Sequence, residues 1–333
     1  MRLRRVMDGA APALQVATGA GWVDVARALP GAHLAGEPGC ASWATDAVAL
    51  LGAPAAVRDA ISLSAASIAP VADDARIPVL PFEPRSFRDF MLYERHAIDA
   101  ARGFVRHFMP RAWPLVRAWE AVLGAPFPPL RPHALWSRQP IYYMGNHLAF
   151  GGDGDVCAPA YTLALDYELE LGFVLTREIV DASPAEAEAA IGGFVVVNDF
   201  SARDVQHAEM RSGFGPQKAK HFRNGLSADI VSADEILPRW RELKGFVRLN
   251  GALVAEPETA GARWSLGEAL AHVSRSERLY PGELFATGTL PGGSGIERGR
   301  LLAAGDEIEI GITGVGALRN RIVAPVHGFG GGS

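Results

Sequence analysis

The sequence predicts an α+β protein in which helices precede a second half dominated by strands. Amphipathic helical patterns cover residues 86–108 and 113–123. Apolar runs separated by turn residues fill most of residues 165–323. The first part of the chain is rich in Ala and Gly and leads into proline-containing extended stretches. We therefore predict a small N-terminal accessory domain over residues 1–75 and a main domain over residues 76–330.

Composition excludes several classes of protein. The 333 residues, 49% of them hydrophobic, suffice for one large domain or one large and one small domain. The net charge of −5 argues against a nucleic-acid-binding surface. Cys40 and Cys157 are too far apart in the sequence for a CxxC or metal motif, which favours a reducing cytoplasm. No run approaches the roughly 18 apolar residues of a membrane-spanning helix, so we expect neither a membrane nor a nucleic acid as partner.

The elements before residue 160 are expected to be a hairpin, helices and a long loop. Residues 14–25 form the hairpin around a glycine-containing turn, and residues 45–51 and 54–63 have short helical patterns. Ser86 is a candidate N-cap for the helix over residues 86–108. Pro, Gly and aromatic residues crowd residues 124–160, and a loop of this length in a compact chain tends to be functional.

An acidic strand is the central motif. Acidic and apolar residues alternate over residues 165–171, which on a strand places Asp166, Glu168 and Glu170 on one face. Three neighbouring carboxylates repel one another unless a cation neutralises them, and Mg²⁺ and Ca²⁺ prefer such oxygen ligands. The same alternation is also typical of a solvated strand face. Periodicity alone leaves both interpretations open.

A second motif follows about thirty residues later. An apolar run predicts a buried strand that ends at an acid, Asp199. Residues 201–204 have the form of a capping box and predict the start of a helix. Arg203 and Gln206 share a face of this helix, next to the acid.

The remaining elements are mostly strands. Asn250 and Gly251, placed between apolar runs, are the strongest short-range signal for a hairpin. The other predicted elements are helices over residues 183–191 and 265–274, a loop over 214–222, strands over 281–289, 305–316 and 318–323, and an irregular end over 330–333.

Four motifs in this order and spacing resemble the fumarylacetoacetate hydrolase family. The resemblance covers residues 86–323, and its most specific parts are residues 165–170, 198–206, 215–222 and 286–289. It implies a mixed-β roll that binds Mg²⁺ or Ca²⁺ and forms a homodimer. It also implies cleavage of carbon–carbon bonds in acylpyruvates and β-diketo acids, whereas relatives hydrate, isomerise or decarboxylate similar substrates.

By the same resemblance, the metal ligands are four carboxylates from separate segments: Asp89, Glu168, Glu170 and Asp199. The expected ion is Mg²⁺, with Ca²⁺ or Mn²⁺ as alternatives. A divalent cation suits this chemistry because a 1,3-dicarbonyl acid can chelate it, and the ion then stabilises an enolate.

The resemblance also assigns the catalytic and substrate-binding residues. His96 would be the general base that activates water, with Glu297 as its partner. Lys220 and Arg203 would stabilise developing negative charge. The substrate-binding residues would be Tyr143, Gln206 and Thr289. Taken alone, a helical histidine is more often structural, a single Lys or Arg more often lies on the surface, and the tyrosine is as readily a packing residue.

The leading hypothesis is a cytoplasmic, metal-dependent hydrolase of a small β-diketo or acylpyruvate-type acid. Water activated by His96 attacks the keto carbon, and an enolate leaves. An alternative hypothesis keeps the site but changes the reaction to decarboxylation, hydration or isomerisation of a 2-oxo acid. A third hypothesis is a metal-binding or scaffold protein without catalytic activity.

Overall fold

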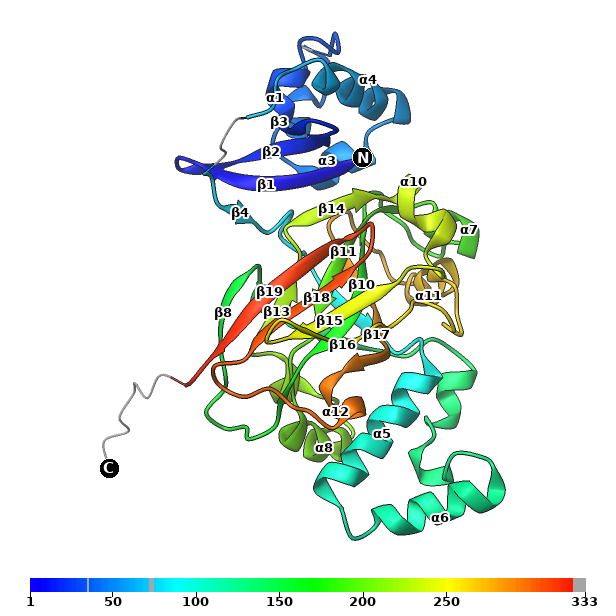
Figure 1. Ribbon diagram of the computed structural model, residues 1–333. Helices are drawn as coiled ribbons and strands as arrows, with labels where there is room; N and C mark the ends of the chain where they lie inside the picture. The colour runs from blue at the N-terminus through cyan, green and yellow to red at the C-terminus, as the bar shows by residue number, and fades with distance from the viewer. Residues whose placement is uncertain (35, 72–74, 326–333) are drawn as a thin grey trace, which may run out of the picture.

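A computed structural model describes residues 1–34, 36–71 and 75–325 of the chain. The predicted α+β class is confirmed, because helices surround two mixed sheets (Figure 1). Within the described residues, the larger sheet has 12 strands and the smaller main sheet has five. The predicted irregular end over residues 330–333 lies outside the described residues. No helix in the described part of the chain is long and apolar enough to cross a lipid bilayer.

The large sheet runs through the centre of the molecule in the order β3-β2-β1-β14-β11-β10-β17-β5-β6. Its strands are β1 (Arg2–Asp8), β2 (Ala11–Thr18), β3 (Gly21–Asp24), β4 (Pro78–Val79), β5 (Phe87–Phe90), β6 (Tyr142–Gly145), β7 (Phe150–Gly151), β10 (Glu168–Leu175), β11 (Ile191–Asn198), β13 (Asn224–Leu226), β14 (Asp229–Ser232) and β17 (Leu284–Ser294). Every residue of β10 and β11 is buried. Both strands therefore lie in the interior of the sheet, as their long apolar runs indicate.

The N-terminal residues form the expected hairpin and short helices, and they extend the large sheet. Strand β1 pairs with β14, with Leu3 opposite Ile230. The helices of this unit are α1 (Val25–Ala28), α2 (Cys40–Trp43), α3 (Ala47–Gly52) and α4 (Ala55–Ala66), of which α1 and α4 lie above β1 and β2 in Figure 1. Leu3 and Leu14 share one core cluster with Val195 and Val197 of β11. Hydrogen bonds and a common core thus join the N-terminal unit to the rest of the chain. The division into two domains at residue 75 stays a prediction.

The helix predicted over residues 86–108 is wrong in its first part. Residues Phe87–Phe90 form β5, which runs parallel to β17, and helix α5 (Glu94–Phe108) begins later. All four residues of β5 are buried, so its two phenylalanines pack on both faces of a strand. A short apolar run cannot be assigned by periodicity alone. Ser86 caps no helix here, because its hydroxyl donates to Glu283 at 2.8 Å.

The second main sheet packs against the large one and fixes the direction of the acidic strand. Its order is β16-β15-β18-β19-β8, with β8 (Gly154–Cys157), β15 (Gly245–Leu249), β16 (Ala252–Ala255), β18 (Glu307–Ile312) and β19 (Gly316–Val323). Leu169 and Leu171 of β10 share a core cluster with Ile308 and Ile310 of this sheet. Because side chains alternate along a strand, the glutamates of β10 point away from that core.

The remaining elements refine the sequence predictions. The Asn250-Gly251 hairpin is confirmed, and both residues have positive φ, 53° and 81°, as a tight turn of this kind requires. The long loop over residues 124–160 contains regular structure, including β6, β7 and β8. The other elements are α6 (Trp113–Leu123), β9 (Leu165–Asp166), α7 (Pro184–Glu188), β12 (Ser201–Ala202), α8 (Arg203–Ser212), α9 (Gln217–Lys220), α10 (Ala233–Ile236), α11 (Leu266–Val273), α12 (Gly295–Arg298) and 3₁₀ turns at Pro128–Leu130, Ala134–Ser137, His147–Ala149 and Leu237–Arg239.

Candidate active site

Strand register brings distant acidic residues to one place. Asp89 on β5 lies opposite Ala286 of β17, and Glu170 on β10 lies opposite Thr289 of the same β17. The neighbouring strand β11 ends at Asn198, one residue before Asp199. Three strands that are adjacent or nearly so therefore deliver three carboxylates to the same region of the sheet.

These three carboxylates, Asp89, Glu170 and Asp199, form what we call the open triad. One oxygen from each lies within 4.8 Å of the others, and the residues are at most 5% exposed. Among the described residues, Oδ1 of Asp89 and Oε2 of Glu170 are buried and accept no hydrogen bond. Burial first, and then the neighbouring carboxylates, raise the pKa of Asp89 and of Glu170 well above their ordinary values. Such a set of oxygens fits a hard divalent cation, which would remove the mutual repulsion.

Glu168, the fourth predicted ligand, lies beside the open triad and is bound by cationic side chains. Its carboxylate accepts from Nη2 of Arg203 at 2.7 Å and contacts Nζ of Lys220, which also contacts Asp199. Burial would raise the pKa of Glu168, but Arg203 and Lys220 lower it below the ordinary value. Glu168 therefore already has counterions within the protein. One of them, Lys220, also links Glu168 to the open triad.

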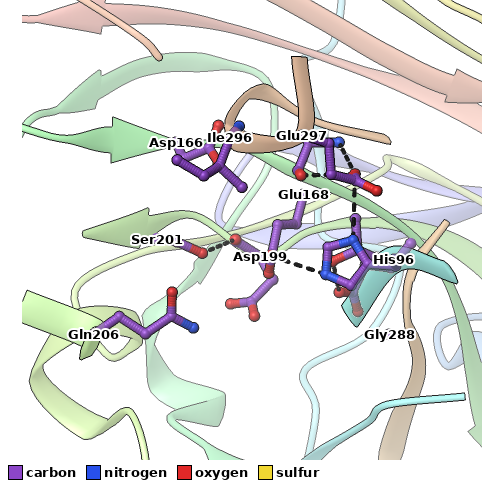
Figure 2. Close-up of polar contacts among 12 residues, drawn as sticks. His96, Asp166, Glu168, Asp199, Ser201, Gln206, Gly288, Ile296 and Glu297 are labelled. Atoms are coloured by element: carbon purple, nitrogen blue, oxygen red, sulfur yellow. Dashed lines mark hydrogen bonds and ion pairs between the residues drawn. The ribbon is translucent and has the colours of Figure 1, made fainter. Parts of the chain in front are cut away.

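A histidine and a glutamate, about two hundred residues apart in the sequence, meet next to these carboxylates. Nδ1 of His96, on α5, lies 3.3 Å from Oε2 of Glu297, on α12. Nε2 of the same ring lies 3.7 Å from Oε1 of Glu168, so the ring stands between the two glutamates (Figure 2). The two helices approach closely because α5 carries Gly103, where a Cβ would lie 2.0 Å from the carbonyl oxygen of Ile296. The structure thus brings together the two members of the predicted base pair.

Glu297 is held by its own turn. Its carboxylate accepts from the backbone N–H of Gly292 at 3.0 Å and of Ser294 at 3.1 Å, and from the Ser294 hydroxyl at 2.8 Å. Burial alone would raise its pKa, but His96 and these hydrogen bonds lower it. Glu297 is therefore suited to remain ionised beside an imidazolium. Ser294 and Glu297 have the spacing of a capping box, a local signal in the sequence from which this support could have been predicted.

Arg203 connects several site residues. Its Nε donates to Asp166 at 2.8 Å, its Nη2 to Glu168, and its Nη1 to Oε1 of Gln206 at 3.0 Å. The predicted capping box in front of it is wrong, because residues 201 and 202 form β12 and helix α8 begins at Arg203. The Ser201 hydroxyl donates instead to the carbonyl oxygen of Asp199 at 3.0 Å. Burial opposes the charge of Arg203, but Glu168 and Asp166 raise its pKa.

The two remaining predicted substrate residues hydrogen-bond to the open triad. The hydroxyl of Tyr143, on β6, donates to Oδ2 of Asp199 at 2.8 Å. The hydroxyl of Thr289, on β17, donates to Oε1 of Glu170 at 3.2 Å. Burial and the surrounding carboxylates, first of all Asp199, raise the pKa of Tyr143 well above its ordinary value. The tyrosine is therefore a hydrogen-bond donor to the site as well as a packing residue.

Two cavities lie outside this cluster. A cavity of about 260 Å³ borders Glu297 on its outer side and is lined by four arginines: Arg95, Arg102, Arg106 and Arg298. A larger one, about 620 Å³, is lined by residues of the N-terminal unit, such as Arg5, and by residues of the rest of the chain, such as Arg85 and Gly282. The larger cavity touches none of the predicted site residues, so volume alone would point to the wrong part of the molecule. The carboxylates and the histidine themselves are nearly closed to solvent.

Comparisons with known proteins match most of the chain. The family model described as the fumarylacetoacetate (FAA) hydrolase C-terminal domain matches residues 130–323. The mitochondrial oxaloacetate tautomerase FAHD1 of Pongo abelii is 30% identical over 190 residues, which are 57% of this chain and 83% of that protein.

Two solved structures have the same fold. The fumarylacetoacetate hydrolase of Exiguobacterium antarcticum is 20% identical, with a TM-score of 0.68 over 97% of this chain and 99% of that chain. A fumarylpyruvate hydrolase of Pseudomonas aeruginosa, solved with Mn²⁺ and pyruvate, is 20% identical, with a TM-score of 0.54 over 76% of this chain and 93% of that chain. These structures confirm the predicted mixed-β fold.

Proposed function

The chain belongs to the fumarylacetoacetate hydrolase family, and from this premise we propose that it is a metal-dependent hydrolase of an acylpyruvate or related β-diketo acid. One observation carries the proposal. The open triad has two buried, unpartnered oxygens and lies next to a paired histidine and glutamate. A cation site and a base are the two parts that hydrolysis of a chelating substrate needs.

Asp89, Glu170 and Asp199 would hold the ion, with Glu168 beside them as the fourth carboxylate. Mg²⁺ is the ion we propose, with Ca²⁺ or Mn²⁺ as alternatives, because all the candidate donors are carboxylate oxygens. When bound, the ion supplies a Lewis acid that polarises a substrate carbonyl.

The residues of the chain supply the base and fixed positive charge. Nε2 of His96 faces the carboxylates and takes a proton from water, while Glu297 on Nδ1 orients the ring and stabilises its positive charge. The hydroxide adds to the keto carbon, the carbon–carbon bond breaks, and its electron pair leaves as an enolate. His96 then returns the proton to the enolate carbon. Arg203 and Lys220 provide positive charge near the oxygen atoms that become negative.

A second candidate is tautomerisation or decarboxylation of a 2-oxo acid such as oxaloacetate. It is supported by the 30% identity to an oxaloacetate tautomerase. In tautomerisation the same base would remove a proton from carbon rather than from water. In decarboxylation carbon dioxide would leave with formation of an enolate, and the protonated imidazole would give its proton to the enolate carbon. Hydration and other isomerisations of 2-oxo acids belong to the same alternative.

The test is an activity screen with Mg²⁺ on acetylpyruvate, fumarylacetoacetate and oxaloacetate. We expect cleavage of a diketo acid that is lost in His96→Ala and in Glu297→Gln. Turnover of oxaloacetate alone would replace hydrolysis by the second candidate. Absence of turnover for all three acids, together with intact metal binding, would favour a metal-binding protein without catalytic activity. We also propose that the protein is a cytoplasmic homodimer, which sedimentation analysis tests for the oligomer.

A further inference from the structure

Asp166 is a buried carboxylate that the proposed chemistry does not use. It is 0% exposed and accepts four hydrogen bonds. Oδ1 accepts from the backbone N–H of Tyr167 at 2.9 Å and of Gly295 at 2.8 Å. Oδ2 accepts from the N–H of Ile296 at 2.9 Å and from Nε of Arg203 at 2.8 Å.

Only an ionised carboxylate satisfies all four donors at once. A neutral carboxyl or an amide would place a hydrogen against at least one N–H, because both oxygens already accept two bonds each. The contact with α12 is also close, since a Cβ on Gly295 would lie 2.3 Å from Oδ1 of Asp166. A larger residue at position 295 would therefore separate the carboxylate from the start of α12.

Asp166 joins the two parts of the site that come from different segments. Helix α12 carries Glu297, one residue after Ile296, and Glu297 pairs with His96. Figure 2 shows Asp166 and Ile296 to the left of Glu297, whereas the imidazole ring of His96 lies below Glu297. On its other side, Asp166 holds Arg203, which also donates to Glu168.

We propose that Asp166 is a positioning residue that fixes the base pair and the arginine relative to each other. It binds the first two N–H groups of α12 and Nε of Arg203 with one carboxylate. A displacement of either element by about 1 Å is enough to lower turnover by about 100-fold. The role in turnover rests on the proposed function of His96 and Glu297, whereas the effect on α12 does not.

The test compares Asp166→Asn with a matched control, Glu283→Gln. Glu283 is also a buried carboxylate that binds an arginine, Arg88, and accepts a backbone N–H, from Tyr280 at 2.9 Å, but it lies outside the site. Amide hydrogen exchange of residues 295 and 296, Mn²⁺ affinity, thermal stability, and kcat and KM on acetylpyruvate and oxaloacetate are measured for each variant and for Glu297→Gln.

We expect Asp166→Asn to speed exchange at residues 295 and 296 and to lower kcat by roughly 10- to 100-fold, with KM and Mn²⁺ affinity within about threefold of the wild type. Glu283→Gln should lose similar thermal stability but keep exchange and kcat. Because Asp166 acts through α12 as well as through Arg203, the loss of kcat in Asp166→Asn combined with Glu297→Gln should be smaller than the product of the two single losses.

Unchanged exchange at α12 in Asp166→Asn overturns the positioning role, whatever the activity. Faster exchange with unchanged kcat overturns the role in turnover and leaves a structural contact only. If the wild type turns over none of the three acids of the activity screen, the proposed function fails, and the exchange measurement still decides whether Asp166 positions α12. Equal loss of kcat in Glu283→Gln would assign the effect to general destabilisation.

Discussion

The acidic residues of the site belong to two groups that differ in how their charge is balanced. In the open triad, Asp89, Glu170 and Asp199 crowd together with buried oxygens that accept no hydrogen bond. Glu168 and Asp166, which we call the compensated pair, are bound by Arg203, and Lys220 contacts the first of them. The protein therefore supplies cations to the compensated pair and, through Lys220, to Asp199, whereas Asp89 and Glu170 keep buried oxygens without a partner. Glu168 and Glu170, two residues apart on β10, therefore differ in how their charge is balanced.

The largest expected effect is on metal binding, and it separates Glu170 from Glu168. Glu170→Gln should weaken Mg²⁺ and Mn²⁺ binding by more than about 100-fold, beyond the loss seen when an outer partner of a ligand is removed. The same change should raise the melting temperature of the metal-free protein, because it removes one of several repelling charges. Glu168→Gln should instead lower that temperature, since it leaves Arg203 and Lys220 with fewer counterions.

Calorimetric titration and thermal unfolding of metal-free protein measure both quantities. If the two variants shift the melting temperature in the same direction, the two groups do not differ in how their charge is balanced. Metal affinity unchanged in Glu170→Gln would remove this residue from the ligand set.

The next effect concerns the cation that links the two groups. Lys220 is buried and contacts both Glu168 and Asp199. Lys220→Met should lower the free energy of unfolding by about 3–5 kcal/mol, because it leaves buried carboxylates without their partner. Exposed Lys218 is the matched control, and Lys218→Met should change stability by no more than about 0.5 kcal/mol. Urea unfolding measures both, and equal losses would mean that Lys220 acts only as a helix residue.

The pH dependence of stability should also distinguish the two groups. Folding raises the pKa of Asp89 and Glu170 above the ordinary 3.8 and 4.5, so the metal-free folded state binds more protons than the unfolded chain above this range. Stability of the metal-free protein should therefore fall as pH rises above about 4.5 and passes through the raised pKa values of the two carboxyl groups. Glu168 has a lowered pKa, so its contribution is fully present above 4.5 and is lost only as pH falls below it.

Melting curves of metal-free protein across this pH range check the sign. Glu170→Gln should flatten the fall, and saturating Mg²⁺ should suppress it, because the ion requires deprotonated ligands. A melting temperature that rises with pH in the absence of metal would contradict the assignment of the open triad.

The sequence predicted the members of the site better than their arrangement. The acidic strand, Asp199 and the pairing of His96 with Glu297 follow from motifs and from family resemblance, and the geometry brings all of them together. Asp89 was placed on a helix, because its strand pairs in parallel with β17, nearly two hundred residues later. Such long-range pairing leaves no local signal in a four-residue segment.

The difference between the open triad and the compensated pair could not be predicted from the alternation of acidic and apolar residues. Periodicity places Asp166, Glu168 and Glu170 on one face and treats them alike. What separates them are side chains and backbone groups that arrive from other segments: Arg203, Lys220 and the N–H groups of α12. Which carboxylate receives which donor depends on the packing of α8, α9 and α12 over the strands, and that packing is a property of the folded chain.

The smallest expected effect tests a neutral donor at the edge of the open triad. The hydroxyl of Tyr143 donates to Asp199 at 2.8 Å, so Tyr143→Phe should lower the stability of the metal-free protein by about 1.5 kcal/mol, the low end for a hydrogen bond to a charged group. Neighbouring Tyr142 packs edge-on against Phe90, which phenylalanine can reproduce, so Tyr142→Phe should change stability little. Bound metal should reduce the difference between these variants, because the ion then carries most of the charge balance at Asp199. If the difference persists unchanged with Mg²⁺, the tyrosine stabilises the fold through packing, and the open triad does not depend on it.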